Sequence, residues 1–216
     1  KVRGNDKEAK VMLALTERAI ELLREGKPAR ALSRTDDEES VFRQLHLLTA
    51  KPVMYVCNVD EDTAANGNAL SEKVAEHAKA EGAVAVVISA AIEAEGAQLS
   101  DPAERAEFLE SLGLEETGLP RVINAGYQLL GLITFLTAGP KESRAWTIPD
   151  GTKAAQAAGT IHTDFERGFI CAETIAYDDY IACKGEQGAK DAGKMRQEGR
   201  DYVMKDGDVI LFRFNV

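Results

Sequence analysis

The sequence predicts an α/β protein, and three observations support this class. Two short apolar runs, Lys51–Cys57 and Ala83–Ile88, are typical of strands buried on both faces of a parallel sheet. A polar, helix-forming stretch between them, Ala69–Ala80, completes a strand–helix–strand unit. After residue 140 the sequence pattern changes to short β-like segments separated by turn signals. We therefore expect a parallel α/β part followed by a small α+β module.

Amphipathic helices are predicted before the first strand. Residues 6–25 carry apolar side chains at three- and four-residue spacing, and Gly26 is a typical helix stop. A second helix is expected to begin at the capping-box pattern of residues 35–38 and to continue through Leu48. From periodicity alone, these helices fit half of an antiparallel arm and a cover for the next domain equally well.

Further helices are expected over residues 102–112 and 120–136, and Ala138-Gly-Pro140 interrupts the chain. We place a domain boundary at 138–140, so that residues 51–138 form the α/β part and residues 139–216 the C-terminal module. In that module, helices are predicted at 152–158 and 187–193. Its strands are predicted at Ser143–Ile148, Thr160–His162, Phe169–Glu173 and Asp208–Phe214.

Composition limits the classes of function. A formal net charge of -10 argues against indiscriminate nucleic-acid binding, so DNA is not an expected partner. No apolar run approaches the roughly 20 residues needed to cross a membrane, and a membrane partner is not expected either. The three cysteines and three histidines show no metal-ligand spacing, so we expect no metal site and assign the protein to the reducing cytoplasm.

Polar residues follow the first predicted strand, where parallel α/β folds place their binding sites. The loop reads Asn58-Val-Asp-Glu61. Guanine-specific domains carry Asn-Lys-x-Asp in this place, in which the aspartate accepts from the N–H groups of guanine. Here Val59 replaces the lysine and Glu61, one methylene longer, replaces the aspartate. We expect loss of the guanine preference, which makes adenine a realistic ligand.

A second loop follows the next predicted strand, at Ser89-Ala90-Ala91. Small residues in this place allow the backbone to approach a bound base closely. Taken alone, both loops are also ordinary turns after a strand.

Longer sequence blocks resemble the YchF/Obg-like ATPase family. Residues 118–140, GLPRVINAGYQLLGLITFLTAGP, look like the end of the nucleotide-binding (G) domain of that family. Residues 144–169 resemble its TGS domain, a ubiquitin-like β-grasp module, and residues 207–215 match its C-terminus. The resemblance covers nearly the whole chain.

The resemblance implies a division into three parts and a function. Residues 1–50 would be the returning half of a helical coiled-coil arm, 51–138 the C-terminal part of a P-loop NTPase domain, and 139–216 the TGS domain. The family has an Asn-x-x-Glu base loop, which Asn58 and Glu61 match. The expected parent is a ribosome-associated switch that binds and hydrolyses ATP, with GTP less favoured and Mg²⁺ as its ion. The purine would contact Asn58, Val59, Glu61, Ser89, Ala90 and Ala91.

The chain departs from the family in one respect. No G-x-x-x-x-G-K-[ST] sequence occurs in the 216 residues, so they contain no phosphate cradle. Phosphoryl transfer depends on positioning and charge stabilisation around the phosphates. We therefore expect a portion of a longer protein that has no catalytic residue, holds no nucleotide or Mg²⁺ by itself and does not hydrolyse ATP alone.

An alternative function is a non-catalytic module in which the TGS domain and the helical arm bind RNA or the ribosome. Candidate contacts in the TGS-like part are His162 and a basic strip of Lys194, Arg196 and Arg200. A histidine in such a module also packs or hydrogen-bonds within it, and a charge run is usually a solvated face.

Overall fold

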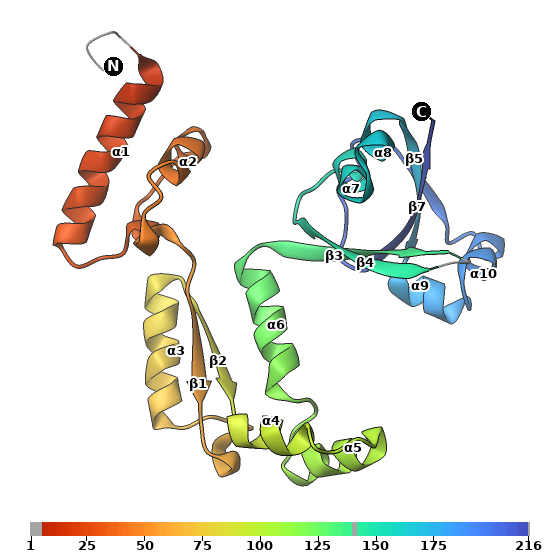
Figure 1. Cartoon of the computed structure of the whole chain (residues 1–216), viewed down its shortest axis with the longest axis horizontal. Helices are drawn as coiled ribbons and strands as arrows, with labels where there is room; N and C mark the ends of the chain where they lie inside the picture. Colours follow the sequence, from red (N-terminus) through yellow and green to blue (C-terminus); the bar gives the residue numbers. More distant parts are fainter. Residues whose placement is uncertain (1–5, 140–141, 216) are drawn as a thin grey trace. The chain divides into compact units, whose positions relative to one another are not determined.

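The computed structural model describes residues 6–139 and 142–215, and it shows a mixed α/β protein (Figure 1). The chain forms two compact units, which divide between Leu129 and Leu130. This division lies earlier in the chain than the boundary expected at 138–140, because residues 132–138 form a strand of the second unit.

The first unit begins with two helices, α1 (Lys7–Arg24) and α2 (Asp36–Arg43). Short 3-10 turns follow each of them, at Ala29–Ala31 and Leu48–Ala50. Gly26 has a φ of 74°, the left-handed conformation expected at a helix stop. The expected capping box is present, since Glu38 accepts from the backbone N–H of Thr35 at 3.0 Å. The second helix ends at Arg43 and does not reach Leu48 as predicted.

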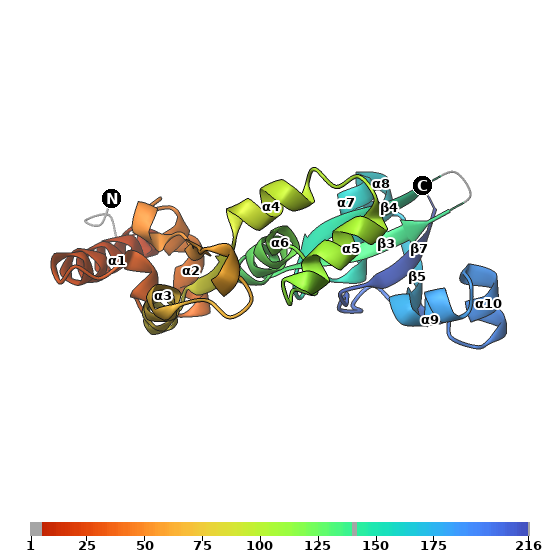
Figure 2. The same ribbon diagram turned by 90° about the horizontal axis from the view of Figure 1, so that it is seen from below.

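The strand–helix–strand unit is confirmed. Strands β1 (Met54–Asn58) and β2 (Val84–Ile88) are parallel and in contact over their whole length. Helix α3 (Ala69–Glu81) joins them, and α3 and α6 (Gly118–Leu129) pack against the two strands from either side (Figures 1 and 2). Helices α4 (Ala90–Gly96) and α5 (Pro102–Ser111) connect β2 to α6, and a 3-10 turn at Glu61–Thr63 follows β1.

Helix α6 begins against the end of β2, and the close approach there requires a glycine. A Cβ on Gly118 would lie 2.7 Å from Ile88 Cγ2 and 2.9 Å from Ile88 Cβ. We expect Gly118→Ala to destabilise the first unit by about 1–3 kcal/mol, because a packed core resists an added methyl group.

The matched control lies in the same helix. A Cβ on Gly126 would meet no atom within 4 Å, so Gly126→Ala should stabilise the helix by about 0.5–1 kcal/mol. Urea unfolding followed by circular dichroism measures both changes. Equal effects of the two substitutions would show that the contact with Ile88 does not constrain residue 118.

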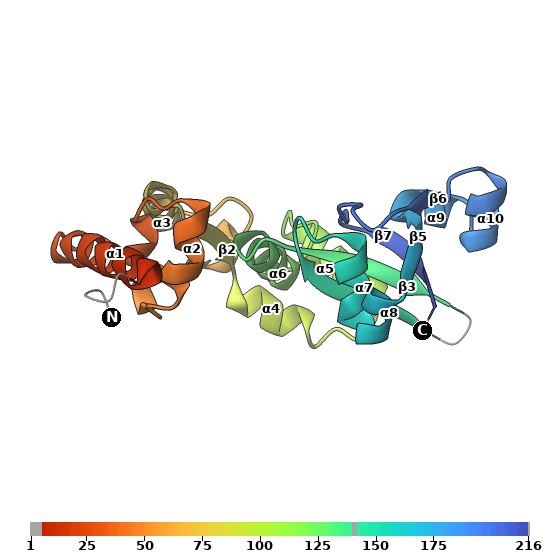
Figure 3. The same ribbon diagram turned by 90° about the horizontal axis from the view of Figure 1, so that it is seen from above.

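The second unit is built on a five-stranded sheet of order β4-β3-β7-β5-β6. Strand β3 is parallel to β7, and the other neighbours are antiparallel. Helices α7 and α8 lie on one face, and α9 lies on the other (Figures 2 and 3). The strands are β3 (Leu132–Ala138), β4 (Ser143–Pro149), β5 (Phe169–Ala176), β6 (Arg196–Glu198) and β7 (Asp208–Phe214). The helices are α7 (Ala154–Ile161), α8 (Thr163–Arg167), α9 (Tyr177–Ala182) and α10 (Glu186–Asp191).

Two predictions for this region were wrong. The helix expected over 120–136 ends at Leu129, because Gly131 turns the chain with a φ of 59° and the β-branched and aromatic run after it forms β3. The strand expected at 160–162 is the end of α7, whose alanines are buried under the sheet.

Candidate functional site

The carboxyl ends of β1 and β2 are joined by hydrogen bonds. The side-chain Oδ1 of Asn58, the last residue of β1, accepts from the backbone N–H of Ala90 at 2.9 Å. One residue later, the backbone N–H of Val59 donates to the carbonyl of Ile88 at 2.9 Å. The structure therefore brings together the two loops that the sequence singles out, and Asn58 braces one against the other.

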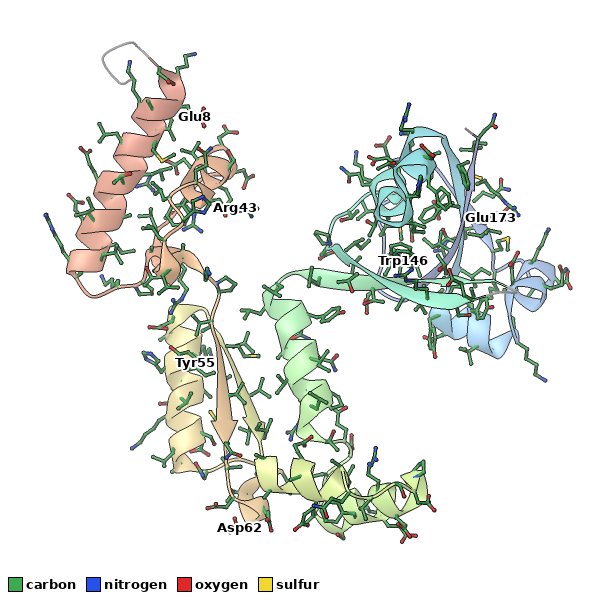
Figure 4. All side chains as sticks on the ribbon, in the orientation of Figure 1. Glu8, Arg43, Tyr55, Asp62, Trp146 and Glu173 are labelled. Carbon is green, nitrogen blue, oxygen red and sulfur yellow. The ribbon has the colours of Figure 1, made fainter. Side chains whose placement is uncertain are left out.

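The first loop leaves a carboxylate exposed beside this brace. Glu61 begins the 3-10 turn after β1, next to Asp62, which is labelled in Figure 4. The side chain of Glu61 is exposed and has no hydrogen-bond or ion-pair partner within the part of the chain that the structure describes. Val59 is half-buried and offers an apolar surface. The loop thus presents an apolar side chain and a free acceptor to solvent.

The second loop starts helix α4. Ser89 is buried, with 3% of its surface exposed, and its Oγ has no partner among the described residues. Ala90 and Ala91 follow with exposed side chains. Behind the loop, the carboxylate of Glu93 accepts from the backbone N–H of Gly118, which fixes α4 against the start of α6. The loop is therefore held from behind while its small residues face outward.

A polar cluster that the sequence analysis missed ties β1 to the N-terminal helices. Glu81, at the end of α3, accepts from the Tyr55 hydroxyl at 3.0 Å and from the Arg30 guanidinium at 2.6 Å (Tyr55 is labelled in Figure 4). The hydrogen bonds from Tyr55 and Arg30 lower the pKa of Glu81, and the same bond raises the pKa of Tyr55. No sequence signal links these residues, because they come from three separate elements.

The candidate contacts of the C-terminal unit are each engaged within the chain. His162 caps α8, where its Nδ1 accepts from the backbone N–H of Asp164 at 3.2 Å. Lys194 pairs with Asp179 at 3.2 Å. Among the described residues, no contact joins His162 to Lys194, Arg196 or Arg200.

The two arginines of the basic strip also have internal partners. Arg196 pairs with Glu198 at 3.1 Å and lies 3.8 Å from Asp208. Arg200 donates to the carbonyl of Glu166 at 3.0 Å, and its guanidinium lies 5.6 Å from the centre of the Phe169 ring. The strip is therefore built into the unit's own hydrogen bonding.

Two properties of the described residues bear on the class of site. Among residues 6–139 and 142–215, no group of three or more His, Cys, Asp or Glu side chains is placed to hold a metal ion. None of the helices in the same residues has the length and apolar character of a membrane span.

The comparisons with known proteins agree with this fold. Residues 132–215 match the family YchF-GTPase_C, described as a protein of unknown function (DUF933). The solved structure of the Schizosaccharomyces pombe YchF GTPase superimposes with a TM-score of 0.80 at 34% identity, covering 93% of this chain and 53% of that one. The chain thus has the mixed α/β fold of the YchF GTPases.

Curated relatives match along the whole chain. The ribosome-binding ATPase YchF of Escherichia coli O157:H7 is 55% identical over 216 residues, and that of Bacillus subtilis is 50% identical. The Obg-like ATPase 1 of Rattus norvegicus is 42% identical over 222 residues. The chain is therefore homologous over its full length to a part of the YchF and Obg-like ATPases, and it contains their C-terminal domain. It spans 59% of the length of the two bacterial relatives and 55% of the rat protein.

Proposed function

We propose that this chain supplies the base-recognition part of an ATPase that binds adenine nucleotides and associates with ribosomes. The observation that carries the proposal is the hydrogen bond from Ala90 N–H to Asn58 Oδ1. Because this bond occupies the oxygen of the Asn58 amide, the amide nitrogen remains available to donate to N7 of a purine. The names of the relatives, ribosome-binding ATPase and Obg-like ATPase, support the same function.

The choice of adenine rests on Glu61. Its side chain is one methylene longer than the aspartate of guanine-specific loops, so its carboxylate is displaced from the position that accepts from guanine and would accept from the exocyclic amino group of adenine. Val59 would cover one face of the base, and the backbone of residues 89–91 would approach from the other side. The exposed side chain of Glu61 has no competing partner among the described residues, so binding would not have to break an existing bond.

The rest of the nucleotide calls for a phosphate-binding part. The 216 residues contain no G-x-x-x-x-G-K-[ST] sequence, and the residues at the two loops fit a base rather than phosphates or Mg²⁺. When present, Mg²⁺ would neutralise charge that develops on the phosphates during hydrolysis. This chain alone would bind a base weakly and would not hydrolyse ATP.

The outer edge of β1 supports the same arrangement. Isolated parallel strands are rare because parallel sheets are buried on both faces. Val56 of β1 is 45% exposed and Leu70 of α3 is 71% exposed, and both line a cavity of about 310 Å³ along this edge. We infer that further strands of a nucleotide-binding domain pair with β1 in a longer protein.

The remaining parts have their own proposed roles. Helices α1 and α2 would belong to a helical arm, and residues 130–215 would form a β-grasp module of the TGS type. A mixed sheet with its first and last strands parallel in the centre, covered by α7, is the arrangement expected of such a module. The names of the bacterial relatives, ribosome-binding ATPase, support a role of these parts in contact with the ribosome. The internal pairing of Lys194, Arg196 and Arg200 gives no preference to a purely RNA-binding function.

A nucleoside tests the base site without phosphates. We expect adenosine at millimolar concentration to shift the backbone amide resonances of Val59 and Ala90, and guanosine to shift them much less. Asn58→Ala should abolish the adenosine response, because it removes both the brace to Ala90 and the donor to N7.

Asn124→Ala is the matched control, since Asn124 is an exposed amide on α6 outside the two loops. It should leave the adenosine response unchanged. Equal responses to the two nucleosides, or an adenosine response that survives Asn58→Ala, would refute an adenine site at these loops.

A further inference from the structure

Among the described residues, β2 pairs with no strand other than β1, and the hydrogen-bonding groups of its outer edge can be assigned. The N–H of Val84 donates to Val53 O, and the carbonyl of Ile88 accepts from Val59 N–H. In a parallel ladder alternate residues face the partner strand, so Val84, Val86 and Ile88 use their backbone groups toward β1. The N–H and C=O of Ala85 and Val87 therefore point away from β1, toward the outer edge.

This edge forms the wall of a groove of about 460 Å³. Its lining consists of residues Val84–Val87 of β2, the loop residues Ala65 and Asn66, and one face of α6, with Arg121, Asn124, Ala125 and Gln128. The α6 side chains recur at spacings of three and four, so they lie along a single stripe of the helix. The groove is thus bounded by a strand edge on one side and a polar helix face on the other.

The polar side chains of the groove have no partners of their own. Within residues 6–139 and 142–215, the side chains of Arg121, Asn124, Gln128 and Asn66 make no hydrogen bond or ion pair, and Arg121 Nε is fully buried without an acceptor. Burying an unpaired donor costs about 1–3 kcal/mol. Such a group is expected where a ligand supplies the acceptor.

The charge of the groove is opposite to that of the chain. Arg121 is the one charged residue in the lining given above, whereas the whole chain has a net charge of -10. The site therefore offers a single guanidinium beside neutral amides and exposed backbone groups. A carboxylate is the side chain that best matches a guanidinium, because it accepts two parallel N–H bonds.

We propose that the outer edge of β2 binds an extended peptide of a partner protein, which adds a strand to the sheet and places an acidic side chain on Arg121. The peptide backbone bonds to Ala85 and Val87, as in other cases of strand addition. Asn124 and Gln128 bond to the peptide groups that face α6. This inference is independent of the proposed adenine site, since it uses the side edge of β2 and none of the base-loop residues at the carboxyl ends of the strands.

The test uses a short synthetic peptide of alternating Val and Thr with a single central Glu, labelled for fluorescence anisotropy. A second peptide with Gln in place of Glu is the reference. We expect the Glu peptide to bind about tenfold more tightly, the gain typical of a charge-assisted hydrogen bond. Arg121→Gln should remove this difference while keeping a polar side chain of similar reach.

Proline substitutions test the backbone contacts. Ala85→Pro removes an outward N–H from β2, and proline is tolerated on an edge strand when its missing N–H faces solvent. It should abolish binding of both peptides. Val56→Pro is the matched control, because Val56 directs its N–H to the opposite, outer edge of β1 and does not line the groove.

Each outcome decides the proposal. Equal affinity for the Glu and Gln peptides, or an Arg121→Gln variant that still prefers Glu, would overturn it. So would equal loss of binding in Ala85→Pro and Val56→Pro. If inorganic phosphate competes with the peptide as well as free peptide does, the groove is an anion site only. If light scattering shows that the chain dimerises through this edge, a second copy and not a partner peptide is the occupant.

Discussion

Replacing Phe135 by Ala is expected to destabilise the C-terminal unit by about 3–5 kcal/mol, the cost of removing a fully buried aromatic side chain. Phe135 is 0% exposed and lies on β3, next to the central strand β7 of the sheet. Its ring stacks on Trp146 at 6.3 Å between centroids and meets Phe212 edge-on at 5.9 Å. The substitution therefore removes contacts with β4 and β7 at once.

The protein contains its own reporter for this experiment. Trp146, labelled in Figure 4, is the single tryptophan of the sequence and contacts the Phe135 ring. Its fluorescence during urea unfolding follows the C-terminal unit. Ile170→Ala is the control, because Ile170 is 60% exposed on β5 and should change the stability by less than about 0.5 kcal/mol. A loss below about 1 kcal/mol for Phe135→Ala would mean that the unit is not held together by this cluster.

The importance of Phe135 illustrates where a single sequence misleads. The sequence predicts this run as the end of a helix over residues 120–136. Gly131 is the physical break: a glycine with a positive φ ends α6 and turns the chain into β3. The β-branched and aromatic residues after it were a strand signal.

The parallel strands and their two loops were predictable for a simple reason. Both strands are short, continuous apolar runs, and the residues after a parallel strand gather at one edge of the sheet. In the structure the two loops lie together, and a hydrogen bond joins Asn58 to Ala90 directly. Local pattern and topology bring the same two loops together here, so no knowledge of distant contacts was needed.

Contacts between residues that are far apart along the chain could not be predicted from the sequence. The Tyr55–Glu81–Arg30 cluster and the stripe on α6 depend on which faces of separate elements meet, which one sequence does not reveal. The same limit explains the basic strip: Lys194, Arg196 and Arg200 look like free charges, but folding provides each of them with a partner. Charge density in a sequence therefore says little about charge available at a surface.

Asp208→Ala is expected to cost the C-terminal unit about 2–3 kcal/mol, since it leaves buried donors without an acceptor. Asp208 is 3% exposed at the start of β7. One carboxylate oxygen accepts from the Tyr202 hydroxyl at 2.9 Å and from the Lys205 backbone N–H at 3.0 Å. The other oxygen lies 3.8 Å from Arg196. Urea unfolding followed by Trp146 fluorescence measures the loss.

The same cluster predicts how stability depends on alkaline pH. Burial, followed by the hydrogen bond to Asp208, raises the pKa of Tyr202 from 10.0 to about 12. A pKa raised in the folded state means that the folded protein favours the neutral phenol. This contribution is complete below pH 10.0 and is lost as the pH rises through about 12. The unit should therefore lose stability over this alkaline range.

Removing Asp208 should separate the two causes of the Tyr202 shift. In Asp208→Ala the ring keeps its burial but loses the carboxylate, so the pKa of Tyr202 should fall toward its ordinary value, as followed by tyrosinate absorbance. Asp201→Ala is the control, because Asp201 is 85% exposed in its side chain and pairs with Lys153 rather than with Tyr202. If the last tyrosine of the wild type and of Asp208→Ala titrated at the same pH, burial alone would hold Tyr202 neutral. Asp208 would then stabilise the turn before β7 through Lys205 and not through the phenol.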